Sequence, residues 1–424
     1  MNFSQQLSKL VSGAAIRNVT LALFLVVFGA GAALAQSKAY VSNVDSNTVS
    51  VIDTSSNAVI ATVPVGAIPV GIAITPNNAF AYVANQGDGT VSVIDTATDT
   101  VTTTIQVGLV PTFVAITPNG SFAYVTNFGF GPVSVIDTAT NTVVASIPVG
   151  FASLGIAITP NGAFAYIVDV STSLSSEVSV VDTTSNTVVA TIPMGGFFVA
   201  SRIAITPNGA FAYVTTSSGN VLVIDTATNT IVTAVPVGAL PTGIDIAPNG
   251  AFAYVVNRFD STVSVIDTAT NTVTATVPVG LFPEGVAVTP NGAFVYVANG
   301  GNNTVNVIDT VNNAVTANIP VGVGPVSIAF TRSQSPQDQI AALIDEVEAL
   351  IAGGSLTQNQ GAGLIDKLNQ ISAKLDANQT GAACNQLSAF NNQVLAFIKS
   401  GALSPSQGQS LINAANSIKT NLGC

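Results

Sequence analysis

The seven tyrosines of this sequence mark an internal repeat. They are spaced by 42, 42, 42, 47, 41 and 42 residues, at Tyr40, Tyr82, Tyr124, Tyr166, Tyr213, Tyr254 and Tyr296. Each unit contains four short runs rich in Val, Thr and Ile, separated by turn sequences such as Thr117-Pro118-Asn119-Gly120. Proline fixes φ and glycine tolerates positive φ, so these sequences form tight turns. Four strands in every unit, repeated seven times, predict an all-β seven-bladed propeller.

The two ends of the repeat region predict how the ring closes. The chain enters at a second strand, Ala39–Asn43, and leaves after an isolated first strand, Val326–Thr331. We expect the C-terminal strand to pair inside the N-terminal blade. All seven blades then have four strands, and the ring has no open seam.

Composition agrees with a ring of buried sheets and excludes several classes of protein. Apolar residues make up 48% of the chain and charged residues only 7%, which is the reverse of a disordered sequence. Each blade is covered on both faces by its neighbours, so its strands can be apolar throughout. The net charge of −11 has the wrong sign for binding nucleic acid.

Histidine is absent from the sequence, and this limits the chemistry that the chain can perform. Without imidazole there is no Ser-His-Asp triad and no histidine-ligated metal. We therefore expect no metal and no cofactor.

The N-terminal residues have the pattern of a secretory signal peptide. Lys9 and Arg17 precede an apolar stretch from Val19 to Leu34, and Ala33-Leu34-Ala35 fits the small-x-small cleavage pattern. The alternative is an uncleaved anchor helix, for which about 16 residues is short. We expect cleavage after Ala35, and a protein that is secreted, periplasmic or attached to the cell surface, with no membrane span afterwards.

The domain organisation follows as signal peptide 1–35, propeller 36–332 and an α-helical domain 333–424. Helical spacing begins after Ser335, and further helices are predicted at Gln358–Ala377, Gly381–Ser400 and Ser404–Leu422. An antiparallel pairing of the last two helices brings Cys384 and Cys424 to one end. This favours a disulfide over two free thiols.

Two segments carry resemblances to known families. Tyr124-Val125-Thr126-Asn127, followed by Val133-Ser134-Val135-Ile136-Asp137-Thr138, resembles the YVTN-type β-propeller repeat, and the likeness extends over about residues 39–331. That family implies a surface or secreted binding protein without a common catalytic motif. Related propellers hydrolyse lactones with a histidine that has no counterpart here. The stretches Leu387–Val394 and Gly401-Ala402-Leu403-Ser404 loosely resemble the FIMAH-type helical module, although its histidine is absent and Val394 stands near that place.

Comparison of the seven units separates a constant face from a variable one. The ITPNG and DTATN turns hardly change, whereas the loops after the tyrosine strands and before the innermost strands do. Variable loops on a rigid scaffold are typical binding sites. Aromatic residues in these loops predict a contact patch for a protein or a glycan, with filling of loop cores and of the channel mouth as the alternative: Phe128, Phe130, Phe151, Phe197, Phe198, Phe259 and Phe282.

Charged residues on three consecutive innermost strands form a second candidate site. They are Arg202, Asp245 and Glu284. A carboxylate pair could act as general acid and base, with Arg202 holding a substrate anion. The alternative is a water-satisfied ion pair in the axial channel. The Asp of each IDT sequence is expected to cap the turn that follows it rather than to bind calcium.

Three hypotheses for function result from these patterns. The first is an exported, monomeric, non-enzymatic propeller that binds a partner through its variable loops. The second is a hydrolase or lyase that acts on a small extracellular substrate with Asp245 and Glu284. The third is a structural component of the cell envelope, attached through its helical tail.

Overall fold

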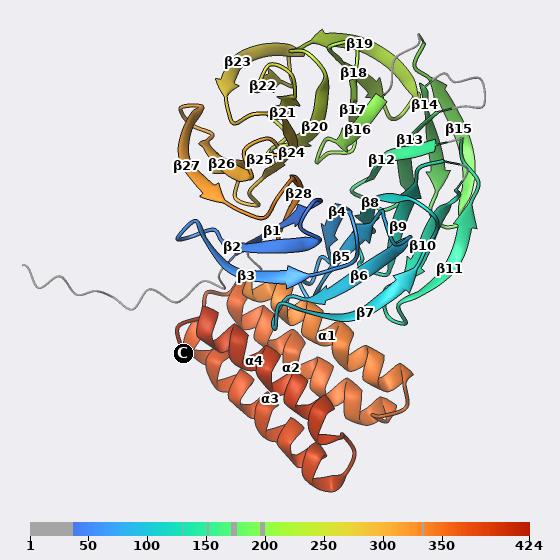
Figure 1. The fold of residues 1–424 in the computed structure, drawn as a ribbon. Coiled ribbons are helices and arrows are strands. Elements are labelled where there is room, and N and C mark those ends of the chain that lie inside the picture. The colour runs from blue at the N-terminus through green and yellow to red at the C-terminus, as the bar shows by residue number, and fades with distance from the viewer. Residues whose placement is uncertain (1–36, 130, 151, 171–175, 196–199, 333–334) are drawn as a thin grey trace, which may run out of the picture.

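The structure is a computed structural model that describes residues 37–129, 131–150, 152–170, 176–195, 200–332 and 335–424. The described chain contains seven four-stranded sheets, arranged as a ring, and four C-terminal helices (Figure 1). The predicted seven-bladed propeller with a small helical domain is confirmed. The predicted signal peptide lies outside the described residues.

Each blade is one antiparallel sheet, numbered here from the N-terminus. Blade 1 contains β28 (Pro325–Phe330), β1 (Lys38–Asn43), β2 (Thr48–Asp53) and β3 (Ala58–Pro64). Blades 2 and 3 contain β4 (Pro69–Ile74), β5 (Phe80–Asn85), β6 (Thr90–Asp95), β7 (Thr100–Gln106), and β8 (Pro111–Ile116), β9 (Phe122–Asn127), β10 (Val133–Asp137), β11 (Thr142–Ile147). Blades 4 and 5 contain β12 (Ala152–Ile158), β13 (Phe164–Val170), β14 (Ser176–Asp182), β15 (Thr187–Pro193), and β16 (Ala200–Ile205), β17 (Phe211–Thr216), β18 (Asn220–Asp225), β19 (Thr230–Pro236). Blades 6 and 7 contain β20 (Pro241–Ile246), β21 (Phe252–Asn257), β22 (Thr262–Asp267), β23 (Thr272–Pro278), and β24 (Pro283–Val288), β25 (Phe294–Asn299), β26 (Thr304–Asp309), β27 (Ala314–Pro320).

Blade 1 closes the ring with strands from both ends of the propeller. Strand β28 is its innermost strand and pairs antiparallel with β1, so that Tyr40 lies opposite Ala329 and Val41 opposite Ile328. The innermost strands of successive blades contact one another all the way round, and β28 contacts both β4 and β24. The predicted closure is therefore confirmed.

The repeated tyrosines connect neighbouring blades. Each of them is at most 1% exposed and lies on the second strand of its blade. The hydroxyl of Tyr124 donates to Asn186 Oδ1 at 2.7 Å in the turn between the third and fourth strands of the next blade, and Tyr82 bonds Asn141 in the same way. Tyr296 of blade 7 bonds Asn57 of blade 1, so the same contact is made where the ring closes. The repeated tyrosine therefore makes the same kind of hydrogen bond to the next blade.

The innermost strands approach one another closely where four blades carry glycine. A Cβ on Gly71 would lie 2.5 Å from the carbonyl oxygen of Thr112, and one on Gly155 would lie 2.7 Å from Cα of Arg202. Glycine is needed there because backbone of the next blade occupies the space. In blades 3 and 5 the corresponding residues are Phe113 and Arg202.

The C-terminal residues fold into four helices with a hydrophobic core of their own. They are α1 (Pro336–Ala352), α2 (Gln358–Asp376), α3 (Thr380–Ser400) and α4 (Pro405–Asn421). Capping boxes begin α1, α2 and α4, with Ser335, Thr357 and Ser404 as the N-caps. Within the part of the chain that is described, no helix is long and apolar enough to cross a membrane.

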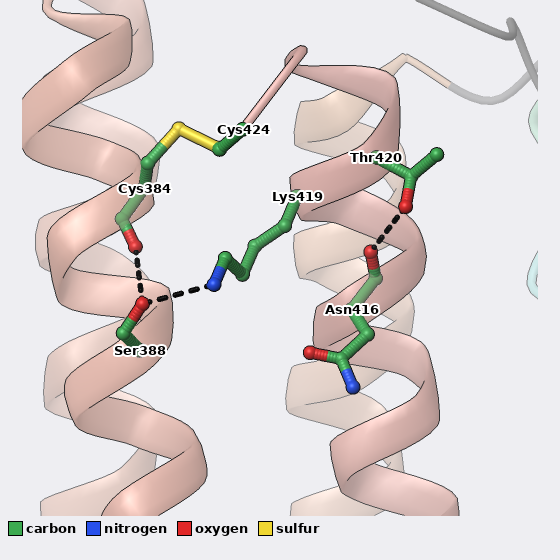
Figure 2. The surroundings of a disulfide bond; sticks show 6 residues. All are labelled: Cys384, Ser388, Asn416, Lys419, Thr420 and Cys424. Carbon is green, nitrogen blue, oxygen red and sulfur yellow. Dashed lines mark hydrogen bonds between the residues drawn. A yellow bond between two sulfur atoms is a disulfide. The ribbon is translucent and has the colours of Figure 1, made fainter.

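Cys384, near the start of α3, and Cys424, just after α4, form a disulfide (Figure 2). Their Cα atoms are 6.1 Å apart. One turn further along α3, Ser388 accepts a hydrogen bond from Lys419 Nζ of α4 at 3.0 Å. The end of the chain is therefore attached to α3 by a covalent and a polar contact.

Candidate functional site

The propeller has a turn face and a loop face. On the turn face, the two constant turns of each of blades 2 to 7 contact each other, as where Thr96 N donates to Ala79 O. Asp95 Oδ1 accepts from the backbone N–H groups of Ala97 and Thr98 at 2.9 and 2.8 Å. The other IDT aspartates cap their turns in the same way, as predicted.

The loop face carries exposed apolar side chains. Phe128 is 45% exposed, Phe259 63% and Phe282 48%, so these three do not fill loop cores. Phe130, Phe151, Phe197 and Phe198 lie outside the described residues. Sequence reasoning looked only for aromatic residues, and therefore missed exposed aliphatic side chains in the loops before the innermost strands: Ile68, Leu109, Leu281 and Val323. They can be recognised in the sequence because they occupy the variable position between the VG sequence and the proline of their units.

Glu284, at the start of β24, forms an ion pair with an arginine of the preceding blade. Its Oε1 lies 2.6 Å from Nε of Arg258, which belongs to the loop between β21 and β22. Burial raises the pKa of Glu284, and the charges of Arg258 and Arg202 oppose that rise. The Arg258 guanidinium lies 5.8 Å from the centre of the Phe282 ring. Sequence reasoning missed Arg258, although it is the basic residue among the loops that follow the tyrosine strands.

Arg202, on β16, stacks on an aromatic ring two blades away. Its Cζ lies 4.0 Å from the centre of the Phe113 ring on β8. Burial lowers the pKa of Arg202 to about 10, and the carboxylate of Glu284 partly offsets this. Within the described residues, its guanidinium makes no hydrogen bond and no ion pair. The sequence does not predict Phe113 as a partner of Arg202, because the two residues belong to different blades and meet only in the assembled propeller.

Asp245 uses both carboxylate oxygens to bind backbone. Oδ1 accepts from Ile246 N at 2.9 Å, and Oδ2 accepts from Val288 N of blade 7 at 2.8 Å. Burial raises the pKa of Asp245 to about 6, and these two bonds oppose the rise. Neither Arg202 nor Glu284 is among the groups that perturb it. The side chain therefore joins blades 6 and 7.

The structure does not assemble the carboxylate pair suggested by the sequence. Asp245 lies opposite Tyr254 in its blade, and Ala287 lies opposite Tyr296, so Asp245 and Ala287 are equivalent positions. Glu284 is three residues before Ala287. The register of β24 shifts at Glu284, and the two positions differ in height by about 10 Å along the strand direction. Neither carboxyl group is among those that perturb the pKa of the other. Glu284 instead forms an ion pair with Arg258 and interacts through its charge with Arg202.

Comparison with known proteins supports the fold. A family model described as "Lactonase, 7-bladed beta-propeller" matches residues 110–272, and one described as "Cytochrome D1 heme domain" matches residues 205–346. Each covers less than half of the chain. Comparison with curated protein sequences finds no match.

Two solved structures are similar to most of this chain. One is hydrazine synthase of Kuenenia stuttgartiensis, at 27% identity and a TM-score of 0.59, covering 64% of this chain and 92% of that one. Another is a functionally unknown protein from Desulfotomaculum acetoxidans, at 21% identity and a TM-score of 0.58, covering 70% of this chain and 99% of that one.

The residues of this chain do not fit the haem that the cytochrome D1 match implies. Haem iron is held by His, Cys, Met or Tyr ligands. The sequence has no His, and both cysteines form the disulfide. The seven tyrosines are buried between blades, and Met194 is also buried. The described residues therefore offer no accessible side chain of the kind that ligates haem iron.

Proposed function

We propose that this chain is an exported, non-enzymatic β-propeller that binds a protein or a cell-surface glycan through its loop face. The observation that carries this proposal is the exposure of Phe128, Phe259 and Phe282, together with Leu109 and Leu281, on loops that vary between blades. Exposed apolar side chains on the loops of a rigid scaffold are typical of interaction surfaces.

Export is supported by the ends of the chain. Residues 1–35 have the signal-peptide pattern, and a structural disulfide is typical of oxidising compartments. The likeness to the YVTN-type repeat and to the FIMAH-type module also favours a secreted or surface protein.

An enzyme that uses Asp245 and Glu284 is not favoured. General acid–base catalysis would require both carboxyl groups to reach one substrate. Asp245 binds two backbone N–H groups, and Glu284 pairs with Arg258.

Crosslinking pull-down of the mature protein from its own envelope tests the proposal. The test variant combines Phe128→Ser, Phe259→Ser and Phe282→Ser. Removing aromatic anchors should reduce partner recovery at least tenfold, since few residues carry most of the binding energy at interfaces. The melting temperature should not change, because these side chains are exposed.

The matched control is Val143→Ser with Val144→Ser, which changes two exposed valines on the outer strand β11. This control should recover the partner as the wild type does. Equal recovery by the loop-face variant and the wild type would show that the loop face is not the binding surface.

A further inference from the structure

The guanidinium of Arg202 is held in place without an acceptor from the protein. Its Cζ lies over the Phe113 ring, 4.0 Å from the ring centre, and the residue is half-buried. An arginine has five N–H donors, and none of those on Arg202 has a partner within the described residues. The guanidinium nitrogens of Arg202 are not among the buried atoms that lack a partner, so water or a ligand can reach these donors.

The charges around Arg202 leave one positive charge unbalanced. Arg202 and Arg258 provide two guanidinium groups, and Glu284 provides the carboxylate, which is already paired with Arg258 at 2.6 Å. This local excess occurs in a chain whose net charge is −11. A monoanion therefore matches the cluster in charge.

In blades 3 and 4, aromatic or small residues occupy the positions equivalent to Arg202 and Ala204. Phe113 and Arg202 lie two residues before Ala115 and Ala204, and residues two apart on a strand share a face. Blade 4, between them, carries Gly155 and Ala157 at the same two positions. This arrangement places a cation beside an aromatic ring and small apolar side chains.

We propose that the channel mouth binds a small organic monocarboxylate with an apolar body. The carboxylate accepts two hydrogen bonds from the guanidinium fork of Arg202, which is the geometry that arginine favours. The apolar body lies against Phe113 and the alanines of blades 3 to 5. This site is separate from the loop-face patch, and the inference does not depend on the proposed partner.

Titration calorimetry of the full chain with phenylacetate tests the proposal. We expect saturable binding of phenylacetate, weaker binding of acetate because it lacks the apolar body, and no binding of the neutral isostere phenylacetamide. Inorganic phosphate is the competing anion. Tighter binding of phosphate than of phenylacetate, equal binding of phenylacetamide, or no phenylacetate binding up to ~10 mM would each overturn the proposal.

Two variants test the residues with little risk to the fold. Arg202→Gly and Phe113→Gly introduce the residue that four other blades carry at this position. Arg202→Gly should weaken phenylacetate binding at least tenfold, Arg202→Lys should weaken it less, and Phe113→Gly should reduce the preference for phenylacetate over acetate. The control Arg332→Ala, at an exposed arginine, should bind as the wild type does. Unchanged binding by Arg202→Gly would overturn the assignment.

The two proposals fail separately. A double variant, Phe128→Ser with Phe259→Ser, leaves out Phe282 because that ring lies near Arg258; it should bind phenylacetate normally, and Arg202→Gly should still capture the loop-face partner.

Discussion

At the scale of single residues, Asp169 departs from the repeat. Five other blades carry Asn at this position, and in blade 2 Asn85 Nδ2 donates to Ser92 Oγ at 2.9 Å. Asp169 is fully buried on β13, opposite Glu177 on β14. Burial raises the pKa of Asp169 to about 7, the Ser179 hydroxyl opposes the rise, and Glu177 adds to it. In the folded state the carboxyl group of Asp169 therefore keeps its proton up to about pH 7, whereas in the unfolded chain it loses the proton near pH 3.8.

Asp169→Asn should therefore stabilise the propeller at and above neutral pH. The pKa of Asp169 is about 7 in the fold and 3.8 as its ordinary value, so between these values the folded state binds more protons than the unfolded state. The free energy of unfolding of the wild type therefore falls as pH rises through this window. The loss is complete above about pH 7. At pH 8 the variant should gain on the order of 2 kcal/mol in the free energy of unfolding.

Urea unfolding of both proteins at pH 4.5, 6 and 8 measures this difference. The control Asp45→Asn removes a charge from an exposed position and should leave the pH dependence as it is in the wild type. A variant that is less stable than the wild type at pH 8 would contradict the assigned pKa shift.

Local chemistry explains why the sequence predicted some residue contacts and missed others. The turn-capping aspartates were predicted because their partners lie two and three residues away, as for Asp95 with Ala97 and Thr98. Arg258 with Glu284, and Arg202 with Phe113, join different blades. Such pairs depend on the register of the innermost strands around the ring, which one blade's sequence does not specify.

At the scale of elements, the disulfide connects α3 to the residue that ends the chain. It joins Cys384 and Cys424, which are 40 residues apart. Closing a loop of that length removes about 3–4 kcal/mol of conformational entropy from the unfolded chain, in the chain-entropy treatment. The buried residues of the four helices form their own cluster, separate from those of the blades. The effect of the disulfide should therefore be confined to the helices.

Reduction of the disulfide should lower the melting temperature of the helical bundle and leave that of the propeller unchanged. All seven tyrosines lie in the propeller and the chain has no tryptophan, so tyrosine fluorescence reports on the ring. Circular dichroism at 222 nm reports on the helices. The Cys424→Ser variant should melt as the reduced protein does. A parallel loss in the tyrosine signal would show that the two units unfold together.

The element boundaries were largely predictable because their signals are local. The last helix was predicted at Ser404–Leu422 and is found at Pro405–Asn421, with Ser404 as its N-cap. The first propeller strand was predicted at Ala39–Asn43 and begins one residue earlier. Proline, glycine and capping residues mark these ends in the sequence itself.

At the scale of the whole molecule, the ring is held by one strand that returns from the far end of the propeller. Besides pairing with β1, the segment around β28 accepts a hydrogen bond from Lys38 N at Thr331 Oγ1 (2.7 Å), and Asn78 Nδ2 donates to Arg332 O at 2.6 Å. The tyrosine contacts also pass across the closure, from Tyr296 to Asn57. Each blade is therefore supported on both sides only when β28 is in place.

A chain that ends at Pro320 should lose cooperative unfolding, whereas one that ends at Arg332 should keep it. Removing β28 exposes the edge of β1 and takes away a neighbour from both β4 and β24, which uncovers buried residues such as Tyr40. An unpaired edge also promotes aggregation. Tyrosine fluorescence during urea unfolding measures the effect in both chains. The chain ending at Arg332 is the matched control, since it also lacks the helices but keeps β28. If the shorter chain unfolds in the same single transition, the return strand does not govern the stability of the ring.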